Sequence, residues 1–118
     1  MEDRRIEDKR AEINRRLSEI QDEVALNKRE QACINEIIDE IIDLKHMYAN
    51  FNEERLAYWA GTEFGREVAE LNSQEEALYN NLIRDAEEGI EERRQAIQRL
   101  LKEERECEDE LMNMRRDY

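Results

Sequence analysis

Isoleucine returns at steps of seven residues through the first half of the chain, and this spacing constrains the fold more than any other feature. The residues at this heptad position are Ile6, Ile13, Ile20, Asn27, Ile34, Ile41 and Tyr48. A second series, four residues further along, contains Leu17, Val24 and Ile38. Two apolar series with this offset draw one stripe along a helix, which is the pattern of a coiled-coil seam.

The composition agrees with long helices. The chain has no Pro, three Gly, 43% charged and 39% hydrophobic residues, and no segment alternates apolar and polar residues over a strand length. The pattern therefore excludes all-β and α/β folds. A net charge of −13 leaves disorder of the isolated chain as an alternative. The regular Ile and Leu spacing opposes it, and we expect association to supply much of the stability.

The heptad rhythm stops between Asn50 and Phe64; the single Trp and Gly61 occur there, and Gly65, the second of the three Gly, follows directly. Gly61 can take the left-handed conformation that ends a helix, and Thr62 can cap the next helix. The sequence therefore predicts one all-α domain over residues 1–118, a long antiparallel helical hairpin. Its helices are expected at about 2–56 and 63–116, with the turn at Trp59-Ala60-Gly61-Thr62.

The second half has a seam of its own, which we expect to face the first helix. Its residues are Phe64, Val68, Leu71, Glu75, Leu78, Leu82, Ala86, Ile90, Arg93, Ile97, Leu100, Glu104, Cys107, Leu111 and Met114. Cys33 and Cys107 would lie roughly 30 Å apart along such a hairpin, at 1.5 Å per residue. We therefore expect both cysteines to be reduced.

An isoleucine-rich band near the middle of the first helix is too wide for one facing helix. The band consists of Ile34, Ile37, Ile38, Ile41, Ile42 and Leu44. It covers roughly half of the helix circumference, whereas a single partner helix fills only a narrow seam. We predict that these six residues bind another protein, because an uncovered apolar patch of this kind marks an interface.

Several classes of function are disfavoured by the residues. Neither half of the chain offers a basic face for nucleic acid, no apolar run is long enough for a membrane span, and the first residues lack the apolar core of a signal peptide. Asp43 and the single His, His46, form at most half of a metal site. With no phosphate loop and no nucleophile beside a base, we expect no enzyme, cofactor or metal, and synthesis in the cytoplasm.

Trp59-Ala60-Gly61, at the centre of an acidic helical hairpin, resembles the Trp-x-Gly turn of the WXG100 (ESAT-6-like) family of type VII secretion proteins. The stretch from Glu108 to Arg116 also resembles the ends of the small helical accessory proteins of LXG-domain toxins. Glu63 stands where that family usually has Ala. The C-terminal export signal of the family, an aromatic residue followed four positions later by an acid, is missing: Phe64 is followed at that distance by Val68 and Tyr79 by Ile83, and Tyr118 is the last residue.

The resemblance implies an adaptor or targeting chaperone that packs against the helical domain of a type VIIb effector. A second small helical protein could join this complex, and the chain could be co-secreted with its partner. The alternative is a structural protein, either a homodimeric four-helix bundle or a continuous rod. Two mid-chain Gly argue against the rod. The polar seam residues Asn27 and Gln31 fit either a solvated segment or a device for partner choice.

Overall fold

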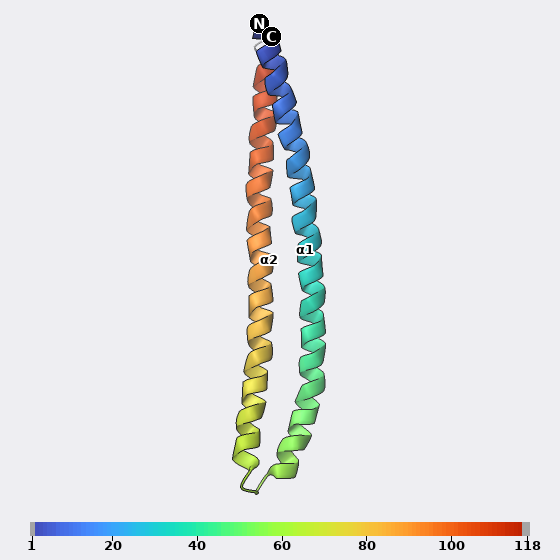
Figure 1. Ribbon diagram of the computed structural model, residues 1–118, viewed down its shortest axis with the longest axis vertical. Coiled ribbons are helices and arrows are strands. Elements are labelled where there is room, and N and C mark those ends of the chain that lie inside the picture. The colour runs from blue at the N-terminus through green and yellow to red at the C-terminus, as the bar shows by residue number, and fades with distance from the viewer. Residues whose placement is uncertain (1, 117–118) are drawn as a thin grey trace. The chain divides into compact units, whose positions relative to one another are not determined.

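The computed structural model describes residues 2–116, and these residues form two helices with no strand between them. Helix α1 spans Glu2–Trp59 and helix α2 spans Gly65–Arg116. The chain reverses direction between them, so the fold is the predicted all-α antiparallel hairpin (Figure 1). Helix α1 continues past Leu56 to Trp59, and α2 begins at Gly65 rather than near Glu63.

The turn uses Gly61 and Thr62 as the sequence predicts. Gly61 has a φ of 80°, in the left-handed region that ends helices. The Thr62 hydroxyl donates to the Trp59 carbonyl at 2.6 Å and accepts a hydrogen bond from the Phe64 amide at 3.3 Å. Side chain and backbone of Thr62 together satisfy groups that the two helix ends leave without helical partners.

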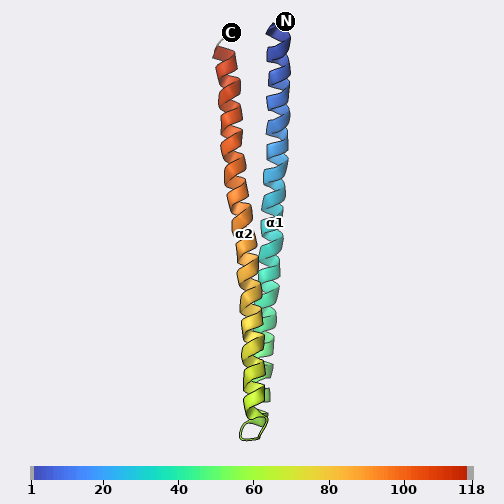
Figure 2. The ribbon, with the colours of Figure 1, turned by 60° about the vertical axis from the view of Figure 1, so that its left-hand side comes forward.

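The hairpin consists of two compact units, and both helices contribute to each. The terminal unit comprises Met1–Gln31 and Glu91–Tyr118, and the turn unit comprises Ala32–Ile90. Within each unit α1 and α2 run antiparallel, which can be followed by the colours in Figures 1 and 2. The two units hold their helix pairs together in different ways.

The terminal unit has an apolar seam. Ile13, Ile20 and Val24 of α1 are its buried side chains, and Ile20 is fully enclosed. On α2 the half-buried residues repeat the predicted seam, including Ile97, Leu100, Cys107, Leu111 and Met114. Heptad spacing therefore predicts the packing here correctly, and hydrophobic burial is the main force that pairs the two helices.

Ion pairs connect the helices along the edges of this apolar seam. Arg16 donates two hydrogen bonds to the Glu103 carboxylate, at 2.7 and 2.8 Å. The contact lowers the pKa of Glu103 and raises the pKa of Arg16. Further pairs join Arg93 to Glu30 and Lys9 to Glu110.

The cysteines lie in different units. Cys107 is half-buried in the terminal unit, and burial raises the pKa of its thiol. Cys33 is exposed in the turn unit, and both are free thiols.

The seam of the turn unit is largely polar near the turn, whereas farther from it the half-buried residues are apolar, among them Ile34, Ile38, Ile41 and Ile83. Lys45 donates to the Asn80 side chain at 2.8 Å, and Asn52 donates to Glu75 at 3.0 Å. Closer to the turn, Arg55 bonds to the side chains of both Asn52 and Asn72. None of the described side chains in residues 32–90 is buried. Near the turn, hydrogen bonds thus take the place that apolar packing has in the terminal unit.

In the turn unit the seam predicted for α2 is right at Val68, Glu75, Ala86 and Ile90, which are half-buried, and wrong by one residue at the other four positions. Phe64, Leu71, Leu78 and Leu82 were expected to face α1, but all four are exposed. The residues that follow the three leucines, Asn72, Tyr79 and Ile83, are half-buried and face α1 instead. The reason is that α1 presents polar groups at this level. A leucine opposite Arg55 or Asn52 would leave their polar atoms without partners, which costs more than an exposed leucine.

Candidate protein-binding face

Exposed apolar side chains gather in the turn unit. Among the described residues, fifteen large apolar side chains are substantially exposed, and twelve of these lie within residues 32–90. The other three, Leu26, Leu101 and Met112, lie in the terminal unit. Scattered exposed apolar residues are ordinary, but such a concentration marks a candidate interface.

On α1 the exposed residues form a regular stripe. Ile37, Leu44, Phe51 and Tyr58 follow one another at steps of seven, and Tyr58 is 77% exposed. The first three each precede a half-buried residue of the seam by one position. One residue corresponds to about 100° of rotation around a helix. The stripe therefore runs along α1 beside the seam rather than inside it.

Phe64, in the turn just before α2, and three leucines of α2 form a matching stripe. Phe64, Leu71 and Leu78 are also seven residues apart, Leu82 follows one turn later, and each again precedes a half-buried residue. In an antiparallel pair, the residue that directly precedes a seam residue lies on the same side of the seam in both helices. The two stripes therefore form one surface, the apolar face. Its residues are Ile37, Leu44, Phe51, Tyr58, Phe64, Leu71, Leu78 and Leu82.

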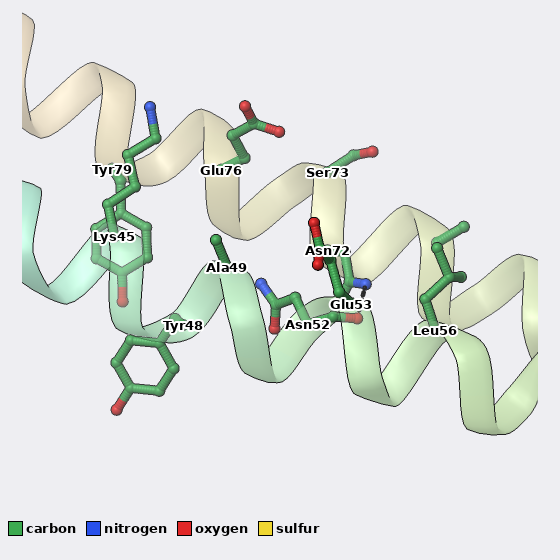
Figure 3. A pocket seen from close by; sticks show the side chains of 11 residues that line it. Lys45, Tyr48, Ala49, Asn52, Glu53, Leu56, Asn72, Ser73, Glu76 and Tyr79 are labelled. Carbon is green, nitrogen blue, oxygen red and sulfur yellow. Dashed lines mark hydrogen bonds between the residues drawn. The ribbon is translucent and has the colours of Figure 1, made fainter.

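The other side of the turn unit has a groove of about 460 Å³ with a mixed polar and apolar lining. Glu53 lines it from α1, Ser73 and Glu76 line it from α2, and Tyr48 and Leu56 add apolar surface. Glu53, Ser73 and Glu76 each follow a half-buried seam residue by one position, which places the groove on the side opposite to the apolar face. Figure 3 shows Glu76 and Ser73 rising from α2 above this groove and Lys45 reaching across from α1.

The groove contains two phenol rings and a network of amides. Tyr48 and Tyr79 stack with ring centroids 6.2 Å apart, and burial, then Tyr48 and Glu75, raise the pKa of Tyr79. Asn72 donates to the Asn52 carbonyl at 3.0 Å. The described residues contain no group of three or more His, Cys, Asp or Glu side chains arranged to hold a metal ion. The groove side chains mainly hold the two helices together.

An aromatic cluster ends the apolar face at the turn. The Trp59 ring meets Tyr58 and Phe64 edge to face, with centroids 5.1 and 5.7 Å away. Trp59 and Phe64 line an open apolar recess of about 330 Å³ together with Glu67, Val68 and Leu71. Aromatic side chains bury large areas and commonly dominate interfaces. The recess can receive an apolar side chain from a partner.

The isoleucine-rich band is divided between the seam and the apolar face. Ile37 and Leu44 are 50% and 41% exposed and belong to the face. Ile34, Ile38, Ile41 and Ile42 are half-buried. Sequence reasoning did not assign the remaining residues of the face to binding. A further heptad series in the sequence could have identified them. It starts at Ile37, and its first three members each stand one residue before a residue of the seam.

Comparison of the chain with protein-family models, curated proteins and solved structures gives no match. Within residues 2–116, neither helix has a stretch both long and apolar enough to cross a membrane.

Proposed function

We propose that this protein is a non-catalytic adaptor that packs the apolar face of its turn unit against helices of another protein. The observation that carries the proposal is the concentration of exposed apolar side chains on one face of the turn unit, beside a seam that is held near the turn by hydrogen-bonded polar side chains. Burying a leucine fully is worth about 1.5–3 kcal/mol, so half-exposed residues in this number offer a large gain on association. Helix-in-groove packing is the recognition mode that suits such a surface.

The partner we propose is the helical domain of a type VII-secreted effector, for which the chain would act as a targeting chaperone. Support comes from Trp59-Ala60-Gly61, which lies between two long helices as in the family that the sequence resembles. The aromatic cluster around Trp59 then belongs to the binding surface. Binding would take place in the cytoplasm before the complex is exported, and a second small helical protein could complete the bundle.

The test uses two variants in which Glu replaces a large apolar side chain, and the two replaced side chains are equally exposed. Leu78→Glu changes the apolar face, and Met112→Glu changes the terminal unit; the two side chains are 57% and 56% exposed. Each variant is co-expressed with the protein encoded by the neighbouring reading frame, provided that this protein has a long helical N-terminal domain. Complexes are measured by size-exclusion chromatography with light scattering.

We expect Leu78→Glu to abolish the complex and Met112→Glu to preserve it, while both variants stay folded by circular dichroism. Equal binding by the two variants would refute the proposal. The second candidate function is a homodimeric four-helix bundle, which is favoured by the fact that both helices contribute a stripe to the same face. A stable dimer of the chain alone that Leu78→Glu converts to monomer would establish it instead.

A further inference from the structure

The charged residues within the apolar face all have the same sign. Three further residues of α1 lie on the same side of the helix, each three residues after one stripe residue and four before the next. They are Glu40, Met47 and Glu54. The corresponding positions of α2 are Glu67 and Gln74, and Asp85 continues the stripe beyond Leu82. The four acidic residues are exposed. No Lys or Arg occupies any position of either stripe between residues 37 and 85.

The few basic residues of the turn unit point elsewhere. Residues 32–90 contain 14 acidic and only 4 basic residues, whereas the rest of the chain has 18 and 15. Lys45 and Arg55 are engaged in the seam by Asn80 and Asn72. Arg66 lies one position, about 100°, around the helix from Glu67, in a surface recess that Ser73 and Gln74 also line, and Arg84 lies two positions, about 200°, from Leu82, so neither occupies a stripe position.

We infer that the partner of the apolar face is an amphipathic helix whose apolar stripe is flanked by Lys or Arg. The inference rests on the proposed function and specifies the chemistry of its partner. Basic flanks would meet Glu40, Glu54 and Glu67 at the edges of the contact, and their aliphatic stems would cover further apolar surface. Opposite charges at such positions set partner choice in helical bundles.

A second copy of the chain fits this face poorly. When the face packs against itself, none of its acidic side chains can meet a base of the other stripe, because both stripes lack Lys and Arg. Like charges across an interface disfavour the wrong partner even where the apolar surfaces match. The acids therefore act against self-association and favour a basic helix.

Two synthetic peptides test the inference. Both are helices about three heptads long with leucine at the apolar positions, flanked by Lys in one peptide and by Glu in the other. Each is titrated into the full chain below its own self-association concentration. The fluorescence of Trp59, the single Trp, reports binding because its ring lies at the end of the face.

We expect the Lys-flanked peptide to bind at least about tenfold more tightly than the Glu-flanked peptide, a difference of about 1.4 kcal/mol. Binding should weaken when salt is raised to about 0.5 M, because salt screens exposed charges. Leu78→Glu should abolish binding and Met112→Glu should not. Glu40→Gln with Glu54→Gln should weaken it, and the control Glu12→Gln with Asp22→Asn, which removes the same charge from the terminal unit, should have less effect.

Each contrary outcome has a distinct meaning. Equal binding of both peptides, lost in Leu78→Glu, would overturn the basic-partner inference and leave the proposed function standing. If the Lys-flanked peptide does not bind although the protein of the neighbouring reading frame does, the basic-partner inference is also overturned and the proposed function also stands. Binding that survives Leu78→Glu would show general attraction to an acidic chain and overturn the inference. A homodimer that Leu78→Glu dissolves would overturn both the inference and the proposed function.

Discussion

Replacing Gly65 by alanine should destabilise the hairpin, although alanine normally stabilises a helix relative to glycine. Gly65 is the first residue of α2. A Cβ atom added there would lie 2.9 Å from the Trp59 carbonyl oxygen and 3.7 Å from the Ala60 Cα. The closer atom belongs to the backbone, so no side-chain rotation relieves the contact.

The magnitude follows from what the Trp59 oxygen already does. It accepts hydrogen bonds from the Thr62 amide at 3.1 Å and the Thr62 hydroxyl at 2.6 Å. Moving this oxygen weakens both bonds, each of which contributes about 1 kcal/mol. Alanine regains at most about 1 kcal/mol in helix propensity. We therefore expect Gly65→Ala to lower the free energy of unfolding by about 1–2 kcal/mol.

Urea denaturation followed by circular dichroism at the helix band measures this change as a lower midpoint. The control is Gly61→Asn. Gly61 has a φ of 80° and no atom within 4 Å of an added Cβ, so a residue that tolerates the left-handed region should be accommodated there with little loss. A midpoint for Gly65→Ala equal to or above that of the unmodified chain would refute the argument from close approach.

Two further predictions concern the difference between the units. Backbone amides in residues 37–51 should exchange with deuterium faster than those in residues 13–24, because the described buried side chains all lie in the terminal unit; equal protection by mass spectrometry would contradict this. Arg16 lowers the pKa of Glu103, so their pair stabilises the fold fully above the ordinary carboxyl pKa of about 4.3 and loses this effect as pH falls. Glu103→Gln should therefore reduce the loss of stability between neutral pH and about pH 3, measured by urea midpoints, whereas Glu12→Gln should not.

The terminal unit could be predicted because its sequence pattern and its packing agree. Ile13, Ile20 and Val24 occupy seam positions and are the buried residues. The half-buried residues of the facing helix include apolar ones such as Ile97, Leu100 and Leu111, so hydrophobic periodicity identifies the side that faces inward. The turn could be predicted for a similarly local reason, since Gly61 and Thr62 act through their own backbone conformation and hydrogen bonds.

The outward positions of Leu71 and Leu78 could not be predicted in this way. The two leucines form as good a seam by periodicity as any in the chain, yet they are exposed. Near the turn the inward position is taken by Asn72, because Arg55 of the opposite helix donates to its side chain. A pattern read along one helix does not contain this information. The choice depends on both helices together.

The acidic charge of the chain is concentrated in the turn unit, which also carries the apolar face. The adaptor proposed above would expose leucines and aromatic residues before its partner arrives, and would have to avoid its own copies. The net charge of −10 on residues 32–90 opposes self-association of this surface. The terminal unit, which buries its own apolar seam, is close to charge balance. The acids that repel a second copy are also the groups that a basic helix would neutralise. Solubility without a partner and selection of the partner would then have the same physical cause.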